Sequence, residues 1–199
     1  MIQNKDMEND ILKTDYLEKV IIEDKEFNNY YNYIEIKNCS FKNCNFEKAI
    51  FQGIDIDSTV IEKSNLSNQQ LLNHSFNEVV FHNCNLVGIN FTDSYLENVT
   101  FDNCNLMYAN FNSTNLKSVT FKSCNLKSAS FNDVKWKKLI LDNCSLKYTE
   151  FQKTSLKDLD VSSCDIKDIQ IDINHLRGLI VSWDQAITVA ALLGIKIKN

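Results

Sequence analysis

The feature of this chain that most constrains its fold is an apolar residue at every fifth position from Ile36 to Val181, without a break. An α-helix repeats every ~3.6 residues and a flat strand every ~2, so neither produces this period. A second small or apolar residue lies two positions before the central one, and residues two apart on an extended chain face the same side. Because the next inward residue comes three positions later, each five-residue unit needs a corner. The chain must therefore wind round a polygon.

The cysteines indicate how many sides the polygon has. Six of the seven follow a spacing of twenty residues, with Ser64 in the single gap: Cys44, Cys84, Cys104, Cys124, Cys144 and Cys164. Twenty residues are four units, which predicts four sides per coil and ladders such as Phe81, Phe101 and Phe121. The weakest units are at 69–78, where Gln69 and His74 occupy inward positions. We expect a bulge or a loosened coil there, but no inserted loop, because Cys44 to Cys84 spans whole coils.

Several units resemble the pentapeptide-repeat family. They are CNLVG (84–88), CNLMY (104–108), ANFNS (109–113) and ASFND (129–133), and the resemblance covers about three quarters of the chain. It implies an all-β fold, a right-handed quadrilateral (four-sided) parallel β-helix of pentapeptide repeats, here with a short C-terminal α-helix.

Three segments are expected: an N-terminal cap at 1–30, the β-helix at 31–181, and a capping and dimerisation helix with a tail at 182–199. A stack of coils exposes its core and strand edges at each end, so both ends need a cover. In the first segment we expect a short helix and then a strand; the helix would use Ile11, Leu12, Tyr16, Leu17, Val20 and Ile21.

The C-terminal segment carries its own signals. Ser182 and Gln185 fit a capping box, Gly194 is a natural helix stop, and the alternation of Ile195–Lys198 predicts a last strand. The helix between them is apolar on more than one face. One face would cover the core, and the surplus predicts a homodimer through the C-terminus; the alternative is capping alone. The residues assigned to dimerisation are Trp183, Ile187, Ala190 and Leu193.

Composition limits the cellular setting. No stretch approaches a transmembrane span, and the polar, acidic start does not resemble a signal peptide. We therefore expect a cytoplasmic protein without membrane contact. All seven cysteines fall at inward positions, which predicts reduced thiols that pack as small apolar groups. Their spacing is not that of a zinc site.

The sequence offers no catalytic constellation. Its three histidines are His74, His82 and His175, none at a plausible catalytic spacing from a cysteine, and a glycine-rich phosphate loop is absent. A β-helix filled by side chains also has no cleft. We expect a binding protein that is not an enzyme and has no catalytic residue, metal or cofactor.

Charge is unevenly distributed along the chain. Residues 1–110 hold 17 acidic and 8 basic side chains, whereas residues 111–160 hold 5 acidic and 9 basic ones. We define the acidic stripe as Asp55, Asp57, Glu78 and Glu97, which with Glu35 fall on the side of Leu96 and Leu116. The basic belt comprises Lys117, Lys122, Lys127, Lys135, Lys137, Lys138 and Lys147.

The expected dimensions approach those of duplex DNA. Facing walls roughly 10 Å apart give a rod about 20 Å across, and about seven coils at ~4.8 Å give about 35 Å of length. Duplex DNA of that length carries on the order of twenty negative charges, against a formal net charge of −5 here. If the rod mimics duplex DNA, it does so by its shape and by one acidic stripe, and not by its charge density.

The unbroken repeat and the end Leu192-Leu193-Gly194-Ile195 resemble the quinolone-resistance (Qnr-type) branch of the family. This resemblance implies a dimer that binds type II topoisomerases, DNA gyrase and topoisomerase IV, and protects them from fluoroquinolones, without direct nucleic-acid binding. Some members carry projecting loops needed for protection; this register has no room for them and is similar to the loopless members from Gram-positive bacteria. We assign partner binding to the acidic stripe.

A second hypothesis is a generic interaction scaffold with an unrelated protein partner. We define the apolar patch as Val87, Met107 and Tyr108, which occupy outward positions on adjacent coils with Tyr148 nearby. Exposed apolar patches of this kind mark partner sites.

Overall fold

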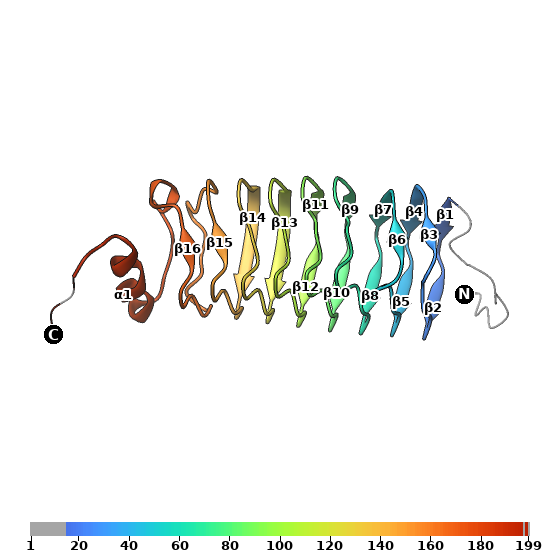
Figure 1. Cartoon of the computed structure of the whole chain (residues 1–199), viewed down its shortest axis with the longest axis horizontal. Coiled ribbons are helices and arrows are strands. Elements are labelled where there is room, and N and C mark those ends of the chain that lie inside the picture. The colour runs from blue at the N-terminus through green and yellow to red at the C-terminus, as the bar shows by residue number, and fades with distance from the viewer. Residues whose placement is uncertain (1–14, 197, 199) are drawn as a thin grey trace.

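The computed structural model describes residues 15–196 and residue 198. The chain forms an all-β parallel solenoid of about 8 turns that ends in one short α-helix (Figure 1). Strands pair in parallel with strands one turn away, as Leu96 does with Leu116 and Phe81 with Phe101. This twenty-residue register confirms the four-unit coil predicted from the cysteines.

Each turn has four faces, which we number in chain order. The first face contains β1 (Tyr16–Glu18), β4 (Ile34–Lys37), β7 (Ile54–Asp57), β9 (Ser75–Asn77), β11 (Tyr95–Glu97) and the beginnings of β13 (Asn115–Lys122) and β14 (Lys135–Asp142). The second face contains β2 (Ile21–Glu23), β5 (Ser40–Lys42), β8 (Val60–Glu62), β10 (Val80–His82), β12 (Thr100–Asp102) and the ends of β13 and β14.

The other two faces have shorter pairings. The third is held by single bridges along a column that includes Asn65, Asn85 and Asn105. The fourth has similar bridges and two strand pairs: β3 (Tyr30–Tyr31) with β6 (Ile50–Phe51), and β15 (Glu150–Phe151) with β16 (Gln170–Ile171).

The corners depend on residues in the left-handed backbone region. Asn83 and Asn103 have φ of 55° and 53°, and the same sign recurs at five-residue intervals along much of the rod. Asn, Asp and Gly adopt this conformation most readily, because a short polar side chain or the absence of Cβ reduces its cost. Corners thus account for part of the Asn-rich composition, and side-chain ladders account for more of it: the Asn85 amide, for example, donates to Asn65 Oδ1 at 3.0 Å.

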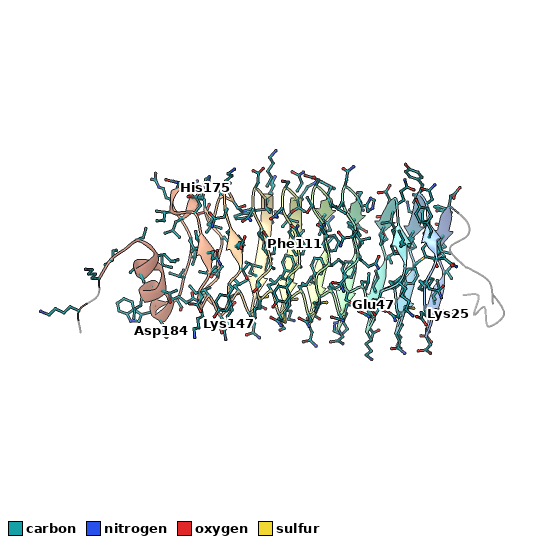
Figure 2. All side chains as sticks on the ribbon, viewed as in Figure 1. Lys25, Glu47, Phe111, Lys147, His175 and Asp184 are labelled. Atoms are coloured by element: carbon teal, nitrogen blue, oxygen red, sulfur yellow. The ribbon has the colours of Figure 1, made fainter. Side chains whose placement is uncertain are left out.

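Aromatic ladders fill the interior. The rings of Phe81 and Phe101 stack with centroids 4.9 Å apart, and those of Phe101 and Phe121 with centroids 4.8 Å apart. Phe111 belongs to the neighbouring ladder and meets Phe101 edge-on at 6.0 Å. Figure 2 shows Phe111 in the middle of the rod and Lys147 near its lower edge. The inward register predicted from the sequence is confirmed.

The N-terminal helix prediction is wrong for the described residues. Tyr16–Glu18 and Ile21–Glu23 are strands of a further coil, so the rod begins before residue 31. Leu17 pairs with Ile36, nineteen residues later, whereas Tyr31 pairs with Phe51 after twenty. One residue fewer in this coil shifts the period by one position and obscures it in the sequence. Ile11 and Leu12 lie outside the described residues.

The coil at 69–78 is loosened on the fourth face, as expected, and contains no inserted loop. Gln70 forms a bridge with Asn90 of the next coil, but among the described residues no bridge joins it to Ile50 of the preceding coil. Ile56 and Phe76 keep the twenty-residue register. Gln69 is 4% exposed, and its Nε2 donates to the carbonyl oxygens of Phe46 at 2.6 Å and Ala49 at 3.0 Å. A polar side chain fits this inward position because the preceding coil supplies carbonyl acceptors.

All seven cysteines are buried and free, as predicted. The Sγ of Cys104, for example, donates to the Phe81 carbonyl oxygen at 3.3 Å. Burial raises the pKa of the Cys39 and Cys44 thiols, which keeps them protonated. Within residues 15–196, no group of three or more His, Cys, Asp or Glu side chains could hold a metal ion.

The C-terminal helix α1 spans Trp183–Leu192 and begins with the predicted capping box. The Ser182 hydroxyl accepts from the Gln185 backbone N–H at 3.3 Å, and the Gln185 side chain accepts from the Ser182 N–H at 2.8 Å. Gly194, with φ of +74°, ends the helix. The expected last strand is not formed at Ile195, Lys196 or Lys198. Among described residues, no helix is both long and apolar enough to cross a membrane.

Candidate partner-binding surfaces

Side chains fill the interior of the rod, so its functional groups lie on the outside. Three surfaces follow from the sequence hypotheses: the acidic stripe on the first face, the apolar patch on the third face, and the C-terminal helix.

Register places the acidic stripe along the first face. Asp55 pairs with Glu35 on one side and with Ser75 on the other, and Asp57 occupies the parallel column that leads to Glu97. Glu78 lies at the corner that follows β9, with φ of 53°. The structure therefore brings these carboxylates together on neighbouring strands.

Half of the stripe is neutralised by lysines in the same column. Asp57 lies 3.4 Å from the Lys37 ammonium and accepts from the Asn77 amide at 2.6 Å, which lowers its pKa, with the Asn77 bond as the larger cause. Glu97 pairs with Lys117, and chiefly this contact lowers the Glu97 pKa. Both carboxylates stay ionised at neutral pH, but their charge is largely matched locally.

The remaining carboxylates of this face are unpaired. Among described residues, Glu35, Asp55 and Glu78 have no Lys, Arg or His nitrogen within 4.0 Å. Asp55 accepts from the Ser75 N–H at 3.3 Å, and Glu78 accepts from the Ser58 hydroxyl at 3.1 Å. These three side chains carry most of the free negative charge of the first face.

Farther along, the first face changes sign. The column that contains Asp57 and Glu97 continues directly into Lys117 and Lys137, and Lys135 stands beside them in β14. Sequence reasoning identified the basic belt by its place in the chain but did not place it on the same face as the stripe. The shared face could have been recognised from the sequence, because Glu97, Lys117 and Lys137 are twenty residues apart.

The apolar patch lies on the third face, as expected from the repeat. The Gly88 N–H donates to the Met107 carbonyl oxygen at 2.8 Å, so Val87 and Met107 lie on adjacent turns. Tyr108 is 58% exposed at a corner with φ of 59°. Tyr148 is two turns away, with the Lys127 ammonium 5.8 Å from its ring centroid.

The C-terminal helix covers the rod with one face and leaves another exposed. Val189 and Leu192 pack against the core, whereas Trp183 is 88% exposed and Ile187 58%. Leu193 is also exposed, and Ala190 is partly buried. Three of the four residues assigned to dimerisation therefore face outward.

Gln185 has a second role that the capping-box pattern did not predict. Its Nε2 donates to the carbonyl oxygens of Cys164 at 2.6 Å and Val161 at 2.9 Å. These carbonyls belong to the end of the stack, where no further coil accepts the strand edge. One side chain thus both starts the helix and covers the open edge.

A family model for the pentapeptide repeat region matches residues 30–111 and 74–151, which together make up more than half of the chain. The chain therefore belongs to the pentapeptide-repeat family. No curated protein matches it.

Several solved structures are similar to the chain. One is a trypsin-treated form of QnrB1, a plasmid-mediated fluoroquinolone resistance protein, with TM-score 0.40 and 18% identity over 92% of this chain and 100% of that one. Another is HetL, involved in heterocyst differentiation regulation in Nostoc sp. strain PCC 7120, with TM-score 0.28 and 13% identity over 83% of this chain and 91% of that one. Rfr23 from Cyanothece 51142 has TM-score 0.30 and 18% identity over 64% and 88%, respectively. The likeness concerns architecture alone.

Proposed function

We propose that this chain is a cytoplasmic, non-enzymatic binding protein that protects DNA gyrase and topoisomerase IV from fluoroquinolones. The observation that carries the proposal is the group of unpaired carboxylates Glu35, Asp55 and Glu78 on one face of a solid rod. The rod is about 20 Å wide, near the width of duplex DNA. The resemblance of its repeat and C-terminal sequence to the Qnr-type branch supplies the partner.

Electrostatics would govern how such a rod meets its partner. A surface that binds DNA is basic, and three unpaired carboxylates at β-sheet spacing attract it. Complementary charge of this kind mainly sets the encounter rate and the register, and it weakens with salt. Lys37 and Lys117 reduce the charge of the stripe, so the attraction is weaker than that of duplex DNA.

The C-terminal end supports a homodimer. Trp183 and Ile187 present apolar surface to solvent beside Leu193. Leu176, Leu179 and Val181 of the last coil remain only partly buried beneath the helix. A second copy of the chain would cover both sets at once, and burial of apolar surface is the main force in such assembly.

A supercoiling assay tests the proposal. The mixture contains DNA gyrase, ciprofloxacin and the full chain, and the wild type should restore supercoiling at modest molar excess. The variant Glu35→Gln, Asp55→Asn, Glu78→Gln should lose the rescue because it removes the unpaired charges with little change of shape. A control variant with Glu47→Gln, Asp93→Asn and Asp142→Asn removes equal charge from elsewhere and should rescue normally. No rescue by the wild type at any dose would refute the proposal.

The apolar patch keeps a second candidate function open. Tyr108 is largely exposed next to Val87 and Met107, which suits a scaffold that binds an unrelated protein through its third face. A Met107→Ser, Tyr108→Ser variant distinguishes the two functions. It should rescue gyrase like the wild type if the acidic stripe makes the contact, and it should lose partner binding if the patch does.

A further inference from the structure

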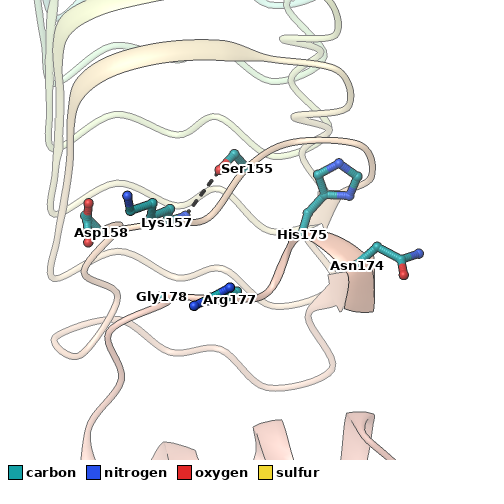
Figure 3. Close-up of a pocket in the computed structure, with 7 residues that line it drawn as sticks. All are labelled: Ser155, Lys157, Asp158, Asn174, His175, Arg177 and Gly178. Carbon is teal, nitrogen blue, oxygen red and sulfur yellow. Dashed lines mark hydrogen bonds between the residues drawn. The ribbon is translucent and has the colours of Figure 1, made fainter.

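A pocket near the C-terminal end of the rod is not used by either function. It has a volume of about 510 Å³ and lies between two successive turns. Figure 3 shows Ser155 and Lys157 on one turn and His175 and Arg177 on the next, with Asp158 at one side.

One backbone hydrogen bond beside the pocket departs from the regular pattern of the coils. The Leu156 N–H donates to the His175 carbonyl oxygen, nineteen residues later, but the Asp158 N–H donates to the Gly178 carbonyl oxygen at 3.0 Å, twenty residues later. Gly178 has φ of +89°, and a Cβ there would lie 3.2 Å from the Lys157 Cα. The offset returns to nineteen at the bond from the Val161 N–H to the Ile180 carbonyl oxygen, so no residue is inserted. Glycine at position 178 lets the two turns remain in contact.

A short 3₁₀ helix, η2 (Ile173–His175), fixes the rim of this pocket. Its N-cap residue Asp172 accepts from the Asn174 N–H at 3.0 Å and lies 2.8 Å from His175 Nδ1. A carboxylate can only accept, so Nδ1 carries the proton in this contact. The Asp172 charge is thus engaged by the donors of its own turn and is not available to Arg177.

The free charge of the pocket is positive. Arg177 is the only arginine in the chain. Neither it nor Lys157 has a carboxylate oxygen within 4.0 Å among the described residues. Asp158 supplies one opposing charge. Lys157 and Arg177 also continue the twenty-residue spacing of Lys117 and Lys137, so positive charge increases toward this end of the first face.

We propose that this pocket binds a small phosphate-bearing anion. The Arg177 guanidinium matches two phosphate oxygens at once, the Lys157 ammonium adds a point charge, and the Ser155 hydroxyl adds a donor. The site is an open depression of about 510 Å³, because its lining residues are exposed except for the half-buried His175. A longer polyanion would extend over Lys137 and Lys117 before it met Glu97, so the test includes duplex DNA as the alternative ligand.

Calorimetric titration of the full chain with pyrophosphate tests the inference. The wild type should show saturable binding at one site per chain. Arg177→Ala and Lys157→Ala should each weaken it at least tenfold, and Arg177→Lys should weaken it too, because an ammonium cannot bind two oxygens in a fork. Lys122→Ala is the matched control, since Lys122 is an exposed lysine on the second face with no carboxylate oxygen within 4.0 Å in the part of the chain that the structure describes. It should bind like the wild type.

Three outcomes would overturn the proposal. The first is the absence of binding up to millimolar pyrophosphate. The second is unchanged binding in Arg177→Ala and Lys157→Ala with unchanged thermal melts, which would place the anion elsewhere. The third is tighter binding of a duplex DNA fragment through the same two residues, which would make the ligand a nucleic acid. None of these measurements uses a topoisomerase, so the inference and the proposed function fail separately.

Discussion

Phe111 occupies the middle of an aromatic ladder, and its removal tests the fold most directly. The ring is fully buried and stacks between Phe91 and Phe131, with centroids 5.3 and 4.7 Å away. Two further rings, those of Phe101 and Phe121, meet it edge-on at 6.0 and 5.4 Å. The Phe111→Ala variant would therefore lose contacts above, below and beside the ring.

We expect Phe111→Ala to cost about 3–5 kcal/mol of unfolding free energy, the range for a buried Phe reduced to Ala. The upper part of this range applies here because turns on both sides hold the cavity walls apart and limit collapse. In a chain of this size each kcal/mol lowers the melting temperature by about 2–4 °C, so the expected shift is roughly 6–20 °C.

Thermal melts of Phe111→Ala, Phe121→Ala and Lys122→Ala decide the question. Lys122 is exposed on the second face, and its replacement should change the melting temperature little. If all three variants melted together with the wild type, the Phe side chains would not be the core, and the inward register would be refuted.

The seven cysteines should react slowly with a thiol reagent in the native protein and quickly in denaturant, because they are buried and burial raises the pKa of Cys39 and Cys44. A rapidly labelled native cysteine would contradict their place in the wall. Sedimentation should give a dimer for the wild type and a monomer for Ile187→Glu, because a carboxylate cannot be buried unpaired in an apolar interface. Ile140→Glu, an equally exposed isoleucine of the rod wall, should remain dimeric; a monomeric wild type at micromolar concentration would argue against the dimer.

The solenoid could be predicted from the sequence because two independent patterns indicate the same architecture. The five-residue period sets the corners, and the cysteine spacing sets the number of sides; both lead to the Leu96–Leu116 register. The first coil was not predicted, because it is one residue shorter than the others and this shifts the five-residue period. Leu17, Ile22 and Phe27 are nevertheless five residues apart, so a search that allows a one-residue phase shift would have found it.

The sequence predicted where the surface residues lie but not which of their charges form ion pairs. Asp57 and Glu97 face outward as expected, but their pairing with Lys37 and Lys117 becomes visible only when charges are compared twenty residues apart. The sequence indicated a weak unit at Gln69 but not how it is satisfied, because the hydrogen-bond acceptors of Gln69 are carbonyl groups, which side-chain patterns do not reveal. The pocket at Arg177 lies where one backbone hydrogen bond, from Asp158 to Gly178, is shifted by a residue, and the side-chain pattern does not reveal such a shift.

The reversal of charge along the first face restricts how the proposed partner could lie. A groove that is basic throughout would attract Glu35, Asp55 and Glu78 but would repel Lys135 and Lys137, so full-length contact carries a penalty. The proposed topoisomerase contact therefore belongs to the N-terminal turns. The lysine-rich turns stay outside the groove, and they lead directly to the exposed apolar face of α1. Partner binding at one end and dimerisation at the other are then sterically compatible, and two such rods joined through their C-terminal helices would present their acidic halves at opposite ends of the dimer.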